Sequence, residues 1–184
     1  MPIGIYIDNS AWDFLFARKL DLAIELPREQ FCICITREAE FEIPPIQFKN
    51  PKLKAYIEGS IKRCEIQTDS FFGFYDESLP ENEQRVEGWD VGRWANSQEL
   101  AFIDRQRRRL GDKKKRTRLH PMEADISLAA RSFHSIVLTA EKKTTRGSLR
   151  DAFNEGGKVI FLGDFDKNGM SLSDFIRSAF PVAD

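Results

Sequence analysis

The sequence has few of the residues on which zinc and disulfide chemistry depend. Its 184 residues include two histidines, His120 and His134, and three cysteines, Cys32, Cys34 and Cys64. Cys32 and Cys34 lie two residues apart in a predicted strand and do not form a Cys-x-x-Cys pair. Structural zinc sites need four Cys or His ligands at regular spacings. We therefore predict no zinc site, and we expect reduced cysteines in a cytoplasmic protein.

The sequence also lacks long apolar runs. None approaches the roughly eighteen residues of a membrane-spanning helix, so we expect no membrane association. The segment Met1-Pro2-Ile3-Gly4 has no basic flank and leads into no signal-peptide core. There is no glycine-rich phosphate-binding loop of the Walker type. These absences argue against secreted, membrane and P-loop proteins.

Charge is balanced in total but separated along the chain. The formal net charge is −1, with 41% hydrophobic and 31% charged residues, which is ordinary for a soluble globular domain. Residues 76–90 contain six acids and one base, whereas residues 105–118 contain nine bases and one acid. Such blocks are either solvated faces or surfaces that bind nucleic-acid phosphates. For the basic block both interpretations stay open.

Strand and helix signals alternate along the chain. The predicted strands cover residues 3–8, 31–36, 135–139 and 158–162, and the main predicted helices cover residues 10–25, 51–63, 97–110, 121–133 and 148–154. A last helix should begin near Ser171, and Ser10 should cap the first. The alternation predicts a three-layer α/β/α fold with a central parallel sheet, in a single domain of residues 1–184.

The segment at about 46–118 interrupts this alternation and is predicted to be an insertion. It holds the charge blocks and several aromatic residues that could stack on nucleic-acid bases or could form its core. These are Phe71, Phe72, Phe74, Trp89 and Trp94.

Four carboxylates follow predicted strands or begin helices that could lean over them. Asp8 ends the first apolar run, Glu141 follows a later one by two residues, Glu40 lies four residues past Thr36, and Asp125 opens a helical stretch. Acids that converge repel one another unless a positive charge compensates. A hard divalent cation with oxygen ligands is the natural compensator, and it suits phosphodiester hydrolysis.

Three segments resemble the acidic motifs of the PIN-domain family. They are Ile5-Tyr6-Ile7-Asp8-Asn9-Ser10, the stretch Asp125-Ile126-Ser127-Leu128-Ala129-Ala130, and Val137-Leu138-Thr139-Ala140-Glu141. The resemblance covers roughly residues 1–44 and 119–165. It implies a PIN-like fold and a nuclease that uses Mg²⁺ or Mn²⁺.

The resemblance also implies roles for individual residues. Asp8 would be the first metal ligand, Asp125 the third, and Glu141 the fourth, where the family usually has aspartate. The second acid is a choice among three neighbours: we select Glu40, with Glu42 as the next candidate and Glu38 as an acid of the helix N-terminus. Outside the resemblance, Ser10 and Thr139 are expected to orient these carboxylates or metal-bound waters.

These observations predict a metal-dependent endoribonuclease. Small PIN domains of this kind resemble the toxins of toxin–antitoxin pairs, so the expected partners are RNA, an antitoxin protein and a second copy of the chain. Two alternatives stay open. One is a structure-specific DNA nuclease or repair factor, and the other is a scaffold whose site has decayed and which binds RNA or a protein partner.

Overall fold

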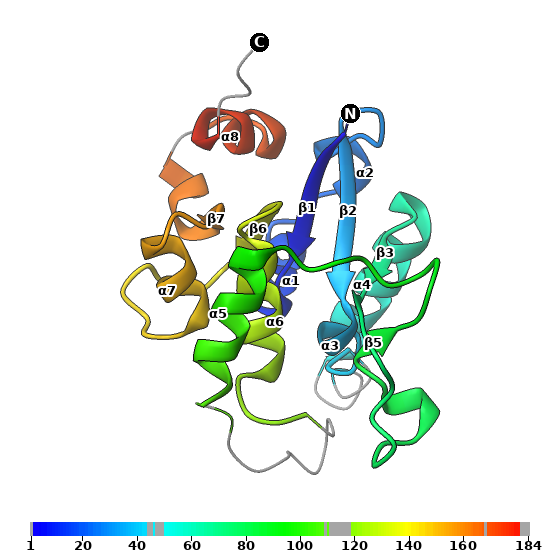
Figure 1. Ribbon diagram of the computed structural model, residues 1–184. Helices are drawn as coiled ribbons and strands as arrows, with labels where there is room; N and C mark the ends of the chain where they lie inside the picture. Colours follow the sequence, from blue (N-terminus) through cyan, green and yellow to red (C-terminus); the bar gives the residue numbers. More distant parts are fainter. Residues whose placement is uncertain are drawn as a thin grey trace.

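The computed structural model describes residues 2–43, 46, 50–108, 110, 119–167 and 169–180. Its main strands are β1 (Ile3–Ile7), β2 (Phe31–Thr36), β3 (Gln67–Asp69), β6 (Ile136–Thr139) and β7 (Val159–Phe161). They form one five-stranded sheet in the order β3-β2-β1-β6-β7, and every neighbouring pair is parallel (Figure 1). The predicted central parallel sheet is confirmed.

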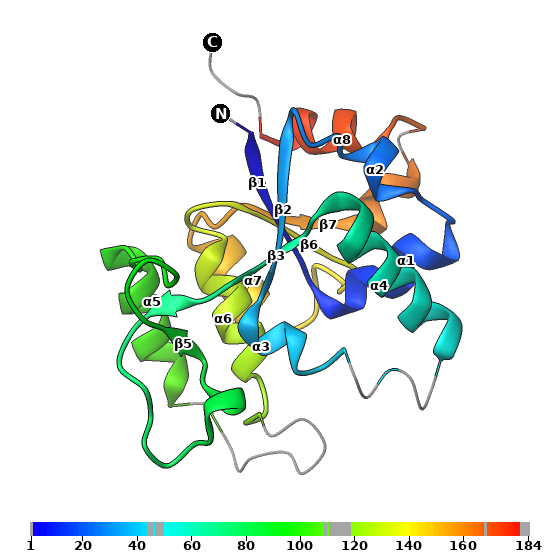
Figure 2. The same cartoon turned by 90° about the vertical axis from the view of Figure 1, so that its right-hand side faces the viewer.

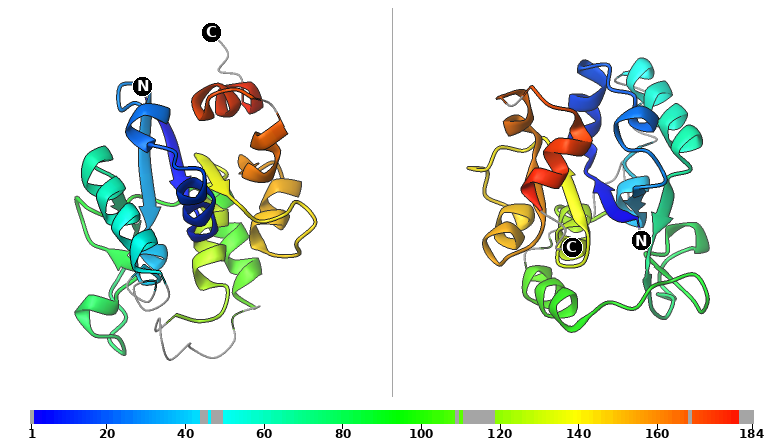
Figure 3. Two further views of the ribbon diagram at one scale, coloured as in Figure 1. Left: turned by 180° about the vertical axis from the view of Figure 1, so that it is seen from behind. Right: turned by 90° about the horizontal axis from the view of Figure 1, so that it is seen from above.

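Helices cover both faces of this sheet (Figure 2). On one face lie α1 (Asn9–Ala17), α2 (Leu22–Glu25), α4 (Pro51–Cys64) and α8 (Leu172–Ala179). On the other lie α5 (Ser97–Arg107), α6 (Glu123–Arg131) and α7 (Ser148–Asn154). From behind, α1 lies between α4 and the C-terminal part of the chain (Figure 3). The three layers match the predicted α/β/α architecture.

The alternation of side chains along β1 explains why there are two cores. Ile5 and Ile7 are fully buried with Trp12 in the core beneath α1 and α4. Tyr6 points to the other face and joins Val137 in the core beneath α6 and α7. Burial of each large apolar side chain contributes about 1.5–3 kcal/mol, so a strand apolar on both faces belongs at the centre of the sheet.

The segment predicted as an insertion divides into two parts. Its first part, α4 and β3, builds the sheet, because β3 pairs with β2 and places Thr68 opposite Ile35. α4 and β3 thus belong to the alternation of helices and strands that builds the sheet, and the bounds of the insertion at about 46–118 stay a prediction. Its later part forms a second small sheet and short helical turns outside the main layers. These are β4 (Phe71–Phe72), β5 (Val86–Glu87) and η2 (Glu81–Glu83).

Side-chain hydrogen bonds cap the starts of two helices, and the sequence predicts the one that begins near Ser171. Thr36 Oγ1 accepts the N–H of Ala39 at 3.0 Å and begins α3 (Arg37–Glu40). Ser171 Oγ accepts the N–H of Asp174 at 3.1 Å and begins α8. Each cap satisfies a backbone donor that has no partner within the helix. The last irregular connection, η3 (Leu162–Lys167), leads from β7 toward α8.

The prediction for residues 10–25 is wrong in two respects. Asp8, and not Ser10, occupies the N-cap position of α1, and the Ser10 hydroxyl turns back toward Asp8. The helix also ends at Ala17, because Lys19 adopts a left-handed backbone conformation with φ of 57°. Asp21 then begins the separate helix α2 by accepting the N–H of Ala23.

A buried ion pair joins α6 to the end of β3. Arg131 is fully buried, and its Nε lies 2.5 Å from Asp69 Oδ2. Its Nη1 donates to the Ser127 hydroxyl at 2.6 Å. Arg93 Nε lies 3.4 Å from the same Asp69 oxygen, and Arg93 also pairs with the buried Glu99 of α5. One charged network therefore connects the sheet, α6 and the outer segment.

We predict that Arg131→Met destabilises the protein by about 3–5 kcal/mol, because it leaves Asp69 without its buried partner. Unfolding in urea, followed by circular dichroism, measures the loss. The control is Arg28→Met, which breaks an exposed pair with Glu65 whose side chains are 56% and 64% accessible, and which should cost under about 1 kcal/mol. Equal stability of the two variants would contradict a central role for the network.

Candidate functional site

The carboxyl ends of β1 and β6 meet where the order of the strands reverses. The chain runs outward from β1 to β2 and β3, and it returns to β6 on the other side of β1. Open parallel sheets bind ligands outside the strand ends at such a switch point. Asp8 directly follows β1, and Glu141 follows β6 by two residues. Both predicted acids therefore lie at the edge where this architecture forms binding sites.

Two hydroxyl groups orient the Asp8 carboxylate. Thr139 Oγ1 donates to Asp8 Oδ2 over 2.7 Å, and Ser10 Oγ donates to the same oxygen. The Ser10 oxygen accepts the N–H of Ala140 at 3.0 Å, and the Thr139 oxygen accepts the N–H of Glu141 at 3.1 Å. The amides leave both hydroxyl protons directed at Asp8. The predicted orienting role of Ser10 and Thr139 toward this carboxylate is confirmed.

Asp8 is buried and forms no ion pair with any residue in the described part of the chain. Asp8 is 7% exposed, and this burial raises the pKa of its carboxyl. The hydrogen bonds from Ser10 and Thr139 lower the same pKa. A buried carboxylate without an opposite charge is costly, so this site favours a cation from outside the chain.

Glu141 and Asp125 add further negative charge at this edge. Burial raises the pKa of the half-buried Glu141 carboxyl, and the charges of Asp8 and Asp125 raise it further. Asp125 lies in the first turn of α6, which packs against β6. The structure thus brings three of the four predicted acids within electrostatic reach of one another.

The acids are of the type that binds a hard divalent cation, but their side chains are not arranged around a common point. Carboxylate oxygens are the ligands that Mg²⁺ and Mn²⁺ prefer, and the Asp8–Asp125–Glu141 cluster carries the charge to hold one. Among the residues that the structure describes, however, no three His, Cys, Asp or Glu side chains are arranged to hold an ion as they stand. Binding would therefore have to draw the carboxylates together.

The three candidates for the second acid point in different directions. Glu40 is partly exposed and pairs with Arg37 at 2.6 Å. Glu42 Oε2 accepts a hydrogen bond of 2.6 Å from Asn9, the residue that follows Asp8. No described contact joins Glu40 to the other three acids, so its metal role stays a prediction.

Glu38, by contrast, turns inward toward α6. It is 7% exposed, accepts a hydrogen bond of 2.6 Å from the Ser127 hydroxyl, and lines a cavity of about 340 Å³. Burial raises the pKa of its carboxyl, and the nearby Arg131 lowers it. Among the main influences on the pKa of Glu38, the charges are those of Arg131, which lowers it, and Glu123, which raises it.

The structure describes part of the basic block and both of the tryptophans that are candidates for nucleic-acid binding. In the basic block of residues 105–118, residues 109 and 111–118 lie outside the described ranges. Of the rest, Arg105 pairs with Glu155 and Arg107 with Asp104 at 3.8 Å. Trp89 and Trp94 are 73% and 67% exposed and pack edge to face, 6.1 Å apart. Their exposure rules out a purely internal role for these two rings.

Comparisons of the chain with protein-family models, with curated proteins and with solved structures found no match. The resemblance to PIN domains therefore rests on the three motifs and on the site that they form. The geometry of that site is the basis for assigning a function.

We predict that Asp8→Asn stabilises the protein near pH 7 in a buffer that contains EDTA. The folded-state pKa of Asp8 is raised above the unfolded value of about 3.9. The stability associated with its protonated form is therefore present below about pH 3.9, and it is lost as the pH rises through the folded-state pKa. At a pH above the folded-state pKa the wild-type protein bears the cost of the buried charge, which asparagine removes.

Urea unfolding from pH 4 to pH 7.5 measures this difference. The advantage of Asp8→Asn should be largest at neutral pH and should vanish toward pH 4. Asp13→Asn is the matched control, because Asp13 lies exposed on the same helix. A variant that is less stable than the wild-type protein at pH 7 would show that the Asp8 charge is compensated.

Proposed function

We propose that the protein is a metal-dependent nuclease that hydrolyses phosphodiester bonds in RNA. The observation that carries the proposal is that burial and the negative charges of Asp8 and Asp125 together raise the pKa of Glu141. These acids lie at the switch point of the sheet, and none of the described ion pairs involves Asp8 or Glu141. Proteins rarely keep such a cluster without a ligand that compensates it. RNA, and not DNA, is chosen because of the PIN resemblance.

Each residue of the site would have a definite task. Asp8, with Oδ2 held by two hydroxyls, would present its other oxygen to Mg²⁺ or Mn²⁺, and Asp125 and Glu141 would complete the carboxylate ligands. When bound, such an ion lowers the pKa of water and offsets the negative charge that develops at phosphorus. Thr139 and Ser10 would keep Asp8 ionised and oriented, because they donate to its carboxylate.

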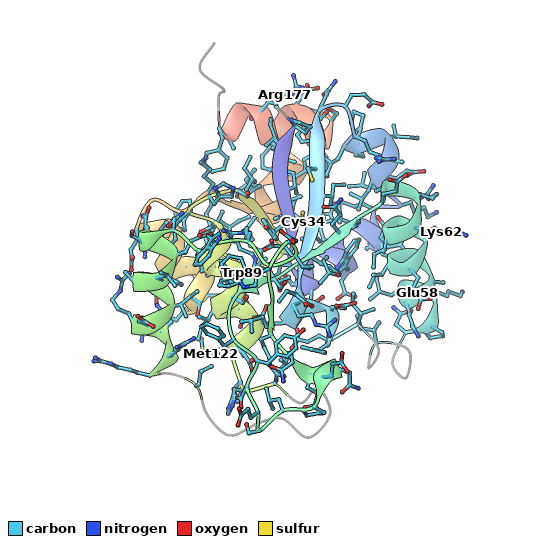
Figure 4. All side chains as sticks on the ribbon, turned by 45° about the vertical axis from the view of Figure 1, so that its right-hand side comes forward. Cys34, Glu58, Lys62, Trp89, Met122 and Arg177 are labelled. Carbon is cyan, nitrogen blue, oxygen red and sulfur yellow. The ribbon has the colours of Figure 1, made fainter. Side chains whose placement is uncertain are left out.

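We predict that the wild-type protein cleaves single-stranded RNA in Mn²⁺ and that Asp8→Asn lowers the rate at least about 100-fold, since a metal-ligand charge is lost. Gel analysis of labelled RNA measures the rate. The control is Glu58→Gln, an acid on the outer side of α4 that Figure 4 shows away from α5 and α6. Folded protein that leaves every RNA intact in Mn²⁺ would overturn the proposal.

Thermal melting supplies a readout that does not depend on activity. Mn²⁺ should raise the melting temperature of the wild-type protein and of Glu58→Gln, and it should leave that of Asp8→Asn unchanged, because a ligand stabilises only the form that binds it. An equal shift in all three proteins would place the ion elsewhere.

The second acid is tested by two further single variants. If Glu40 is the second ligand, Glu40→Gln should reduce Mn²⁺-dependent cleavage by about 10- to 100-fold, as expected when a ligand or the partner that orients it is lost. Glu42→Gln should then have a smaller effect. The reverse order would assign the role to Glu42, whose link to Asn9 already holds it near Asp8.

A binding scaffold is the second candidate, and one observation favours it. Within the described ranges no three metal-binding side chains are arranged as a finished site. If the protein acts by binding alone, Asp8→Asn should leave both RNA binding and the biological effect unchanged. Parallel digestion of RNA and single-stranded DNA separates a ribonuclease from a DNA nuclease. Toxin action with an antitoxin partner is one setting for the proposed activity.

A further inference from the structure

An open groove lies beside the acidic cluster. Its volume is about 690 Å³, and it runs between Met122, at the start of α6, and the segment from Lys143 to Asn154. Both walls are close to the acids in the sequence, because Met122 stands three residues before Asp125 and Lys143 stands two residues after Glu141. A chain lying in this groove would therefore be led toward both carboxylates.

The groove is lined mainly by cations. Lys143, Arg146 and Arg150 face it, together with one acid, Asp151. The Asp151 carboxylate is already engaged, because it accepts a hydrogen bond of 3.0 Å from Gln106. The groove therefore carries a net positive charge immediately next to a cluster of net negative charge.

Two of these cations are available to a ligand. Lys143 is committed, since its Nζ lies 2.5 Å from Asp164 Oδ2. None of the ion pairs formed by the described residues includes Arg146 or Arg150, and the Arg150 guanidinium lies over the Phe153 ring, 5.6 Å from its centroid. Arg146 is exposed to solvent. Guanidinium groups of this kind bind phosphate oxygens in a forked geometry.

We infer that this groove binds the phosphate backbone of the substrate strand, with Arg146 and Arg150 each contacting a phosphate next to the scissile bond. The charge of the groove supports this arrangement, because the phosphates of a strand need cations and Arg146 and Arg150 form no ion pair among the described residues. The identity of the strand as RNA, and its cleavage beside these phosphates, rest on the proposed function. Because phosphate contacts carry no sequence information, the groove would position the strand without selecting its bases.

The test measures binding in the absence of cleavage. In the Asp8→Asn background with EDTA, a fluorescein-labelled 12-residue oligouridine is titrated at several KCl concentrations and followed by fluorescence anisotropy. Arg146→Ala/Arg150→Ala should weaken binding on the order of tenfold. It should also lower the salt slope, log Kd against log [KCl], by about 1.4, since each phosphate contact with a single strand contributes about 0.7.

The matched control removes two cations from other surfaces. Lys62→Ala/Arg177→Ala makes the same change in net charge on α4 and α8, and Figure 4 shows both residues well apart from Met122. It should leave the salt slope unchanged. Equal loss in the two double variants, or an unchanged slope in Arg146→Ala/Arg150→Ala, would overturn the inference.

A single variant and an activity measurement complete the design. Arg146→Gln removes one exposed charge without disturbing the packing, and it should lower the slope by about 0.7. In the wild-type background with Mn²⁺, the arginine variants should raise KM more than they lower kcat. If the wild-type protein binds through the groove but never cleaves RNA, the nuclease proposal fails while the groove stands.

Discussion

The guanidinium of Arg131 lies in the interior between α6 and the end of β3, and the placement of both depends on it. Burying a cation is tolerable only when its charge and its donors are matched, as Asp69 and Ser127 match them here. Ser127 also donates to Glu38, so the same cation helps to fix the connection after β2. Since α6 carries Asp125 and begins at one wall of the groove, a structural ion pair determines where the functional groups stand.

Asp8 is also buried, but unlike Arg131 it forms no ion pair with a described residue. It has two hydroxyl donors, and burial raises the pKa of Glu141 near it, which the charges of Asp8 and Asp125 raise further. Hydroxyl donors orient a carboxylate, but they carry no net charge that could cancel it. Arg131 is thus complete within the fold, whereas Asp8 is incomplete without a ligand. This difference separates an interior charge that the fold itself balances from one that the proposed metal ion would balance.

Much of this arrangement could be predicted from local sequence. Apolar runs located β1, β2, β6 and β7, and the acids that follow β1 and β6 were identifiable because parallel strands end at one edge. β3 escaped prediction, since Gln67, Thr68 and Asp69 are polar and become a strand only by pairing with β2. The inward turn of Glu38 was also hidden, because it depends on Ser127, which is 89 residues away in the sequence. Contacts of this kind exist only after the layers have packed.

The groove raises the question of why its cations do not neutralise the acids beside them. Lys143 pairs with Asp164 instead, on the side of β7, while Arg146 lies just before α7 and Arg150 lies within its first turn. If either arginine had paired with Glu141, neither charge would be available to a ligand. A phosphodiester strand bound with a divalent cation satisfies both sets together, because the ion meets the carboxylates while the flanking phosphates meet the arginines. The separation of charge is therefore a property that a nucleic-acid strand can use and that the folded chain alone does not need.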